Sequence, residues 1–159
     1  MDLDFSTTNW KIKKLDLESL NSTFEFINLV YSSSKIPIGG GWSINQIEEE
    51  IKRSENLSFI FEPFGESIAI LFWQDISQAL EIRFLATHPR FQGRGVMTEV
   101  LRYFQEKVSK NRSIWLEVHE KNISACKLYE KMDFKRVGVR KAYYRDGSSA
   151  FLYSKNGIK

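Results

Sequence analysis

Several features of secreted and membrane proteins are missing from this sequence. It contains one cysteine, Cys126, so no disulfide can form within the chain. No charged segment followed by an apolar run opens the chain, which argues against secretion. The nearest approach to a membrane span, residues 67–73, has the length of a strand and falls far short of the roughly 18 apolar residues required. We therefore expect a soluble cytoplasmic protein without a membrane partner.

The sequence also lacks a block of charge of one sign. Its 23 Lys and Arg residues are scattered among 20 Asp and Glu residues, giving a net charge of +3 and a pI near 8.9. This pattern is typical of an ordinary solvated surface and gives only general support for an anionic ligand. A nucleic-acid site needs a basic stripe with interleaved aromatic residues or a known module, and neither is present. We expect no nucleic-acid partner.

What remains is the composition of one folded domain. Apolar residues make up 42% of the 159 residues and aromatic residues 14%, which favours a packed core over a disordered tail. A chain of this length buries about two thirds of its unfolded surface. No internal repeat, low-complexity tract or linker divides it. We expect a single domain over residues 1–159.

Hydrophobic spacing predicts an alternation of strands and helices. The expected strands are residues 10–14, 57–62, 67–76, 79–87, 114–118, 137–144 and 150–155. The expected helices are residues 17–31, 43–51, 96–108 and 125–132. Ser43 with Gln46 three residues later predicts a capped start for the second helix. Asp146-Gly147 predicts the turn of a hairpin between the last two strands.

Residues 79–118 read as strand, glycine turn, helix and strand, which is a βαβ unit. Its crossover predicts two parallel strands in a right-handed connection. The neighbouring hairpins predict antiparallel pairs on both sides of this unit. The fold class that we predict is α/β (α+β), with a mixed sheet.

The turn at residues 92–97, Gln-Gly-Arg-Gly-Val-Met, is a candidate anion site. A helix start leaves backbone N–H groups without intrahelical partners at the positive end of the helix dipole. Glycine at positions 93 and 95 lets the backbone approach a phosphate closely. Glycines at a strand-to-helix junction are also often plain turn residues.

Two known phosphate motifs fit this turn poorly. A P-loop requires glycine, four residues and then Gly-Lys-Ser/Thr, which the sequence lacks. A dinucleotide fingerprint requires a third glycine at position 98, where Thr98 stands, although Glu117 lies near the expected distance for a ribose-binding acid. The unit also lies mid-chain behind an antiparallel hairpin, which weakens the dinucleotide interpretation.

The turn after His88-Pro89 resembles the Gln/Arg-x-x-Gly-x-Gly/Ala acetyl-CoA motif of the GNAT acetyltransferases. The residues after it resemble the N-terminal-amine acetyltransferases of the ribosomal-protein alanine (RimI) type. They read Leu116-Glu117-Val118, then Asn122, Ala125, Leu128-Tyr129-Glu130-Lys131, Asp133-Phe134 and Arg140-Lys141-Ala142-Tyr143-Tyr144. The resemblance is close over residues 79–153 and loose before them. It implies a single-domain, mostly antiparallel sheet with a central βαβ unit and helices on both faces.

Two positions depart from the family pattern. Met97 stands where the family usually has glycine or alanine, and this flexible side chain can crowd the turn or pack behind it. Asp133 stands where a glycine usually ends the helix, and Asp tolerates the left-handed conformation better than most residues. We expect both sites to keep the family's geometry.

The resemblance implies acetyl-CoA as co-substrate, no metal, and an acetyl-CoA-binding half over residues 79–134. The backbone of Leu85, Ala86 and Thr87 would hold the pantetheine arm, unless it only pairs within the sheet. The turn would hold the pyrophosphate through Gln92, Gly93, Arg94, Gly95, Val96, Met97 and Thr98. Asn122 would cap the next helix and touch the pantetheine chain.

Acetyl transfer to an amine needs a group that takes the amine proton and one that protonates the leaving thiolate. The resemblance assigns these roles to Glu117 and Tyr129. Strand alternation directs Glu117 away from the apolar face of Ile114, Leu116 and Val118, so it can be a base or a strand-end charge paired with a lysine. His119 is a rival base that we interpret as a surface histidine, and Cys126 has only a packing role.

A protein α-amine, with a pKa of about 7.7 to 8.0, loses its proton more easily than lysine, near 10.4, which favours an N-terminal acceptor. Tyr143 and Tyr144, with Trp42 at the end of the opposite glycine-rich loop, would form a slot for a peptide terminus. The acceptor would be a protein N-terminus, possibly ribosomal, and the enzyme a monomer or weak dimer. The alternatives are a polyamine, amino-acid or antibiotic acetyltransferase and a non-catalytic acyl-CoA-binding module.

Overall fold

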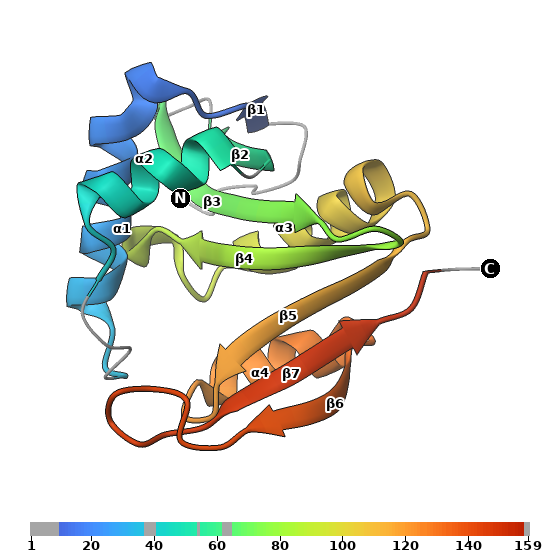
Figure 1. The fold of residues 1–159 in the computed structure, drawn as a ribbon. Coiled ribbons are helices and arrows are strands. Elements are labelled where there is room, and N and C mark those ends of the chain that lie inside the picture. Colours follow the sequence, from blue (N-terminus) through green and yellow to red (C-terminus); the bar gives the residue numbers. More distant parts are fainter. Residues whose placement is uncertain (1–9, 37–40, 54, 62–64, 158–159) are drawn as a thin grey trace.

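The computed structural model describes residues 10–36, 41–53, 55–61 and 65–157, without the side chains of residues 56–61. Within them one seven-stranded sheet has the strand order β1-β2-β3-β4-β5-β7-β6 (Figure 1). All neighbouring strands are antiparallel except β4 and β5, which are parallel. The strands are β1 Trp10–Lys13, β2 Glu55–Phe61, β3 Glu66–Asp75, β4 Ala79–Thr87, β5 Ser113–His119, β6 Lys135–Arg140 and β7 Ala150–Lys155. The predicted α/β class and the mixed, mostly antiparallel sheet are confirmed.

The helices lie near their predicted positions and cover both faces of this sheet. They are α1 Leu20–Ser33, α2 Ile44–Arg53, α3 Val96–Tyr103 and α4 Ile123–Lys131. Short 3-10 turns at Leu17–Ser19 and Pro89–Phe91 precede α1 and α3, and a π-helical stretch, Phe104–Ser109, continues α3. None of the described helices is long and apolar enough to cross a bilayer.

Strand β3 separates two hydrophobic cores because its side chains alternate between the sheet faces. Leu71 and Trp73 join the core beneath α3 and α4. Ile70 and Phe72 join the core beneath α1 and α2, with Ile27 and Ile47 among their neighbours. The buried alternation explains why this strand reads as a nearly continuous apolar run in the sequence.

Predicted caps and turns set the ends of the helices. Ser43 and Gln46 form the reciprocal capping box of α2, with Gln46 N–H donating to Ser43 Oγ at 3.2 Å and Ser43 N–H to Gln46 Oε1 at 2.8 Å. Asp133 adopts the left-handed conformation after α4, with φ of 67°. Asp therefore serves in the position where the family pattern has glycine.

The last predicted strand pair needs a correction. The strand expected at residues 137–144 ends at Arg140, and residues 141–149 form a connection before β7. Ala142 has a φ of 49°, which breaks the extended backbone. The Asp146 carboxylate accepts hydrogen bonds from the backbone N–H and hydroxyl of Ser148, which closes a turn in place of a tight hairpin. The aromatic pair Tyr143-Tyr144 therefore lies in this connection and not in a strand.

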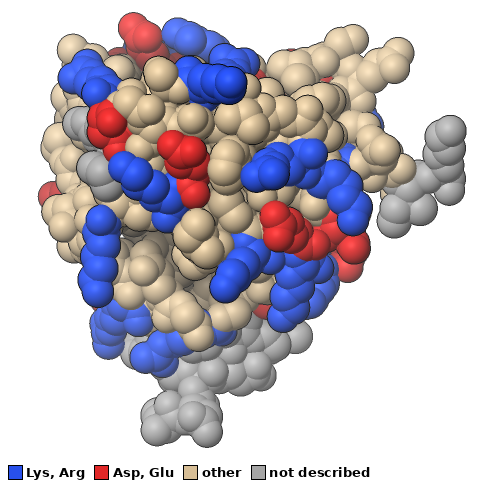
Figure 2. All heavy atoms as spheres, turned by 90° about the horizontal axis from the view of Figure 1, so that it is seen from below, with Lys and Arg blue, Asp and Glu red and all other residues tan. Residues whose placement is uncertain are grey.

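One segment of the chain is richer in basic residues than the rest. Residues 127–146, which cover most of α4, β6 and the start of the connection after it, contain seven exposed Lys or Arg residues and three Asp or Glu residues. Figure 2 shows Lys and Arg outnumbering acids on the face that bears these elements. This surface therefore carries the basic excess of the protein.

Candidate functional site

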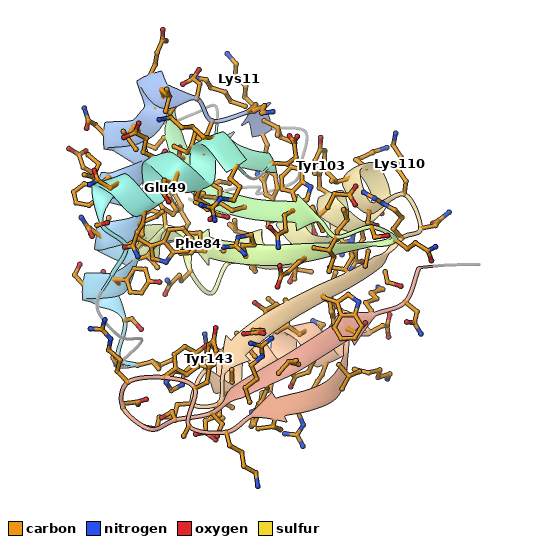
Figure 3. All side chains as sticks on the ribbon, in the orientation of Figure 1. Lys11, Glu49, Phe84, Tyr103, Lys110 and Tyr143 are labelled. Atoms are coloured by element: carbon orange, nitrogen blue, oxygen red, sulfur yellow. The ribbon has the colours of Figure 1, made fainter. Side chains whose placement is uncertain are left out.

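A cleft opens where the parallel strands β4 and β5 separate. Their pairing is recorded only from Ala79↔Ser113 to Ile82↔Leu116, and both strands continue beyond it. The cleft has a volume of about 790 Å³ and is lined by the diverging ends of both strands, the turn before α3, the start of α4 and the end of α1. Figure 3 shows Phe84 and Tyr143 on opposite sides of the opening between the two strands.

The glycine turn forms one wall of this cleft. Gly93 and Gly95 have φ values of 71° and 79°, and Gly95 is the N-cap residue of α3. An ideal Cβ on either glycine would meet no atom within 4 Å, so these positions border open space. Glycine is needed here because of its left-handed backbone. The first N–H groups of α3 lack intrahelical acceptors, so the turn is suited to an anion.

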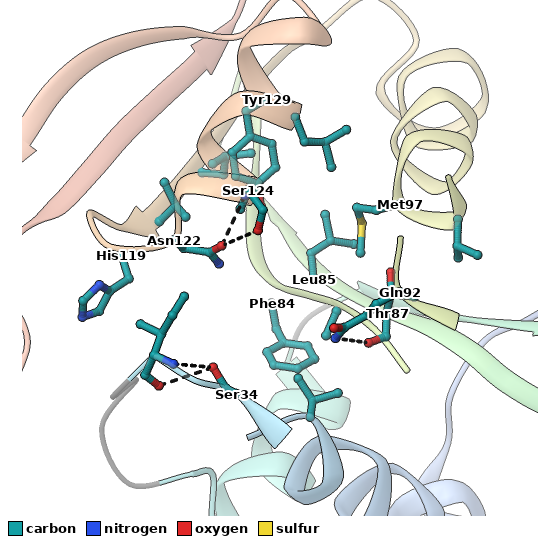
Figure 4. A pocket seen from close by; sticks show the side chains of 18 of the residues that line it. Ser34, Phe84, Leu85, Thr87, Gln92, Met97, His119, Asn122, Ser124 and Tyr129 are labelled. Atoms are coloured by element: carbon teal, nitrogen blue, oxygen red, sulfur yellow. Dashed lines mark hydrogen bonds between the residues drawn. The ribbon is translucent and has the colours of Figure 1, made fainter. Parts of the chain in front are cut away.

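The other turn residues divide between the cleft and the core. Gln92 lines the cleft and donates through Nε2 to the carbonyl of Thr87 at 3.3 Å. Met97 is half-buried, lines the cleft and packs against the larger core (Figure 4). Val96 and Thr98 also line the cleft, whereas Arg94 is exposed and lies outside its lining. Met97 therefore packs against the core and also borders the cleft.

The end of β4 presents a backbone edge to the cleft. Leu85, Ala86 and Thr87 pair on one side with residues 69–71 of β3. No strand among the described residues pairs with them on the other side, because the β4–β5 ladder ends at Ile82. All three line the cleft. An extended chain placed in the cleft would lie along this backbone edge, where the Thr87 carbonyl already accepts a hydrogen bond from Gln92 Nε2.

Two residues that the resemblance singles out come from α4 and its cap. Asn122 Oδ1 accepts a hydrogen bond from the Ala125 N–H at 3.2 Å, so it caps α4 as predicted, and it lines the cleft. Tyr129 also lines the cleft but is only 8% exposed (Figure 4). Burial raises the pKa of its phenol above the usual value of 10. Cys126 is buried in the same core, and burial raises the pKa of its thiol.

Glu117 lines the cleft from β5, on the face opposite the buried side chains of Leu116 and Val118. Its Oε1 lies 3.0 Å from Nε of Arg140, and the Glu117 side chain is 25% exposed. The guanidinium of Arg140 in turn lies over the ring of Tyr143, 5.5 Å from its centre. The charge partner of Glu117 is thus an arginine from β6, where the sequence had suggested a lysine.

The three predicted acceptor residues differ in position. Tyr144 lines the cleft, and burial together with the nearby Glu117 raises its pKa to about 12. Tyr143 is 51% exposed and packs edge-on against Tyr144, outside the lining. Trp42 packs against Phe72 and Phe84 in the smaller core and also lies outside the lining. Only Tyr144 of the three therefore borders the cleft directly.

His119 was expected to be a surface histidine, and this interpretation is wrong. It is 2% exposed at the end of β5 and lines the cleft. Three further residues line the cleft that the sequence does not predict there: Tyr31, near the end of α1, and Arg83 and Phe84 on β4. The spacing of Tyr31 predicts only a place on the apolar face of a helix. Arg83 and Phe84 border the cleft because β4 separates from β5, and no local sequence pattern predicts that separation.

Within the described ranges, no group of three His, Cys, Asp or Glu residues is arranged to hold a metal ion.

The family model for the GNAT acetyltransferase family matches residues 37–134. The chain belongs to this family. The N-alpha-acetyltransferase of Saccharolobus solfataricus is 34% identical over 74 residues, which are 45% of this chain and 44% of that protein. The N-alpha-acetyltransferase RimI of Mycobacterium tuberculosis is 35% identical over 72 residues, 45% of each chain. The chain spans about half the length of these curated relatives.

Two solved structures share nearly the whole fold. The ribosomal-protein-S18-alanine N-acetyltransferase of Escherichia coli superposes with a TM-score of 0.80 at 20% identity, covering 94% of this chain and 95% of that one. Ard1 of Thermoplasma volcanium gives a TM-score of 0.78 at 17% identity, covering 95% and 99%. At these identities the likeness shows the fold, and it covers far more of the chain than the aligned sequence segments do.

Proposed function

We propose that this chain is a single-domain acetyl-CoA-dependent N-acetyltransferase whose acceptor is the α-amine of a protein N-terminus. The observation that carries the proposal is the cleft between β4 and β5, lined by a left-handed glycine turn, Glu117 and Tyr129 together. Family membership gives the reaction class. We place the acetyl-CoA-binding half in residues 79–134.

Two parts of the cleft fit an extended, anionic thioester. The pyrophosphate of acetyl-CoA would bind at Gly93, Gly95 and the first N–H groups of α3, where the backbone borders open space. The pantetheine arm would lie along the free edge of β4 at residues 85–87, as an added strand. Asn122 would contact this arm while capping α4. Acetyl-CoA supplies the activated acetyl group.

The protein's own groups would move two protons during direct attack in a ternary complex. The acceptor nitrogen bonds to the carbonyl carbon while the bond from that carbon to sulfur breaks. Glu117 would take the proton that the amine loses, directly or through an ordered water. Tyr129, which like any phenol is protonated at neutral pH, would give a proton to the sulfur. Cys126 is buried within the core, which favours this direct path over an acetyl-cysteine.

The acceptor assignment rests on chemistry and on relatives. A terminal α-amine is neutral in a larger fraction near pH 7 than a lysine amine, so it needs less help from a base. The relatives with matching segments from Saccharolobus solfataricus and Mycobacterium tuberculosis are named N-alpha-acetyltransferases, and one from Escherichia coli is named for an alanine of ribosomal protein bS18. We therefore propose a protein N-terminus, with a ribosomal protein as the first candidate.

The test is an acceptor panel. Purified protein with acetyl-CoA is mixed with peptides beginning with Ala, Ser or Met, a lysine peptide with a blocked terminus, or spermidine, and free thiol is followed. The proposal predicts turnover on peptides with a free terminus. Turnover on spermidine alone would contradict the acceptor assignment, and acetyl-CoA binding without turnover on any amine would contradict the enzyme assignment.

A further inference from the structure

His119 is the most deeply buried ionisable residue in the cleft, and the proposed proton transfers do not use it. This histidine is 2% exposed and is the last residue of β5. It lies two positions after Glu117, on the same side of the strand. Its ring lies against the ring of Tyr144, with 4.4 Å between ring centres and 30° between ring planes. This is the closest ring contact recorded among the described residues at the cleft.

Hydrogen bonding fixes the orientation of the imidazole. Nδ1 of His119 accepts from the backbone N–H of Lys121 at 3.1 Å, so the neutral ring carries its proton on Nε2. That Nε2 is fully buried, has no hydrogen-bond partner among the described residues and lies 3.6 Å from Oδ2 of Asp146. A donor thus faces a carboxylate at slightly more than hydrogen-bond distance. A small movement of residues 141–149 would be enough to complete the bond.

The same carboxylate organises the connection that bears Tyr144. Asp146 accepts from the hydroxyl of Ser148 at 2.8 Å and from Nζ of Lys121 at 3.1 Å. These interactions lower the pKa of Asp146 well below its usual range and keep it charged. The Glu120 N–H donates to the Ser149 carbonyl at 3.0 Å, and Glu120 Oε1 accepts from the Ser149 N–H at 2.6 Å.

Residues 144–149 are therefore held against the end of β5 by contacts with three consecutive residues, His119, Glu120 and Lys121. Glu120 and Lys121 hold the far part of the connection through Ser149 and Asp146. His119 packs its ring against Tyr144, the aromatic residue that this connection presents to the cleft. The proposed base, Glu117, acts electrostatically on the same tyrosine.

We propose that His119 is a positioning residue for the acceptor: its ring and its Nε2–H set where Tyr144 stands at the acceptor end of the cleft. This inference rests on the proposed acetyltransferase function. It assigns His119 to acceptor binding and not to proton transfer. The enzyme would bind its acceptor less well when this support is lost, while its binding of acetyl-CoA would not change.

The chain offers a matched control for the test. His88, the other histidine, also accepts a backbone N–H two residues ahead through Nδ1, from Arg90 at 3.2 Å, and lies outside the cleft lining. His119→Asn keeps an acceptor for the Lys121 N–H but removes the ring. His119→Phe keeps a ring against Tyr144 but removes both nitrogens. His88→Asn makes the same chemical change away from Tyr144.

Steady-state kinetics are measured for these variants with the acceptor that the wild-type enzyme uses best. An aromatic contact is worth about 0.5 to 1.5 kcal/mol, so His119→Asn is expected to raise the acceptor KM roughly two- to tenfold. The kcat and the KM for acetyl-CoA are expected to stay within about twofold, and His119→Phe to have a smaller effect. A fall in kcat at constant acceptor KM, or unchanged kinetics in His119→Asn, would overturn the proposal.

A measurement without turnover separates this inference from the proposed function. If the wild-type protein acetylates nothing in the panel, the proposed function has failed, and amide hydrogen exchange still tests His119. Faster exchange over residues 141–149 in His119→Asn but not in His88→Asn would support the positioning role. Equal exchange in both variants and the wild type would overturn it.

Discussion

The carboxylate of Glu117 and the guanidinium of Arg140 form an ion pair of 3.0 Å across β5 and β6. These strands are not neighbours in the sheet, because β7 lies between them. The pair therefore reaches over β7 and ties the proposed base to the strand that leads into the connection bearing Tyr143 and Tyr144. Under the proposed function, an acceptor arriving as an ammonium ion would compete with Arg140 for the same carboxylate.

Arg140→Gln removes this competitor. Arg140 is 54% exposed, and an exposed ion pair is worth about 0.2 to 1 kcal/mol. We expect the KM for the acceptor to fall by up to about fivefold, as measured by thiol release over a range of peptide concentrations. The control is Arg145→Gln, because Arg145 is an exposed arginine in the connection between β6 and β7. This substitution should leave the acceptor KM unchanged. A higher acceptor KM in Arg140→Gln alone would mean that the guanidinium itself binds the acceptor.

Tyr129→Phe removes only the phenolic oxygen from a ring buried against Phe134 and Tyr153. A positioned general acid contributes about 10² to 10⁴ in rate, so kcat should fall at least about a hundredfold while both KM values change little. Tyr153→Phe provides the control, because its hydroxyl donates to Glu130 at 2.8 Å and lies outside the cleft lining. Equal losses in both variants would indicate damage to the shared core instead of lost catalysis.

Gly95→Ala tests the glycine turn. The φ of 79° at this N-cap position strains any residue with a Cβ, at a cost of about 1 to 2 kcal/mol. We expect acetyl-CoA binding, measured by calorimetry, to weaken about fivefold or more as the turn shifts. Gly138→Ala is the matched control, since its added Cβ would meet Leu152 at an ordinary 3.8 Å. Unchanged affinity in Gly95→Ala would contradict the assignment of the pyrophosphate to this turn.

Alkaline pH should destabilise the fold through its buried phenols. Burial raises the pKa of Tyr129, and burial together with Glu117 raises that of Tyr144 to about 12. Below pH 10 the folded and unfolded chains both keep these protons, so the full stability is present. Above pH 10 the unfolded chain loses these phenol protons first, so the free energy of unfolding falls as the pH rises toward 12.

Urea unfolding at several pH values, followed by tryptophan fluorescence, checks this expectation. Tyr144→Phe should lose less stability than the wild type between pH 10 and 12, because one of the titrating phenols is gone. If the free energy of unfolding changes with pH in the same way in both proteins, Tyr144 has the same pKa in the folded and unfolded chains, which would contradict this expectation.

Much of the fold was predictable because its signals are local. The pattern of apolar and polar residues predicted both ends of β4 correctly, and the Ser43–Gln46 pair predicted the start of α2. The residues around the glycine turn located the cleft wall through motif resemblance. The strand after α4 was predicted too long because Val137 and Val139 alternate with polar neighbours. The turn that ends it depends on Ala142 backbone geometry and Asp146 side-chain bonds.

The acceptor side of the cleft was harder to predict because distant segments build it. Tyr31, Arg83, His119 and Tyr144 come from four different elements and meet only through tertiary packing. The ring of His119 packs against the ring of Tyr144, a contact that no local pattern in either segment indicates. The position of Trp42 in the smaller core likewise follows from Phe72 and Phe84, which lie far along the chain.

The most direct test of the proposed function is acetyl transfer to a free-terminus peptide by wild type, Glu117→Gln and Glu81→Gln. Glu81 is a partly exposed carboxylate on neighbouring β4 that lies outside the cleft lining, so it controls for charge and fold. We predict that Glu117→Gln lowers kcat at least about a hundredfold with unchanged acetyl-CoA affinity, while Glu81→Gln stays within about twofold of wild type. Full activity in Glu117→Gln would contradict the assignment of Glu117 as the base.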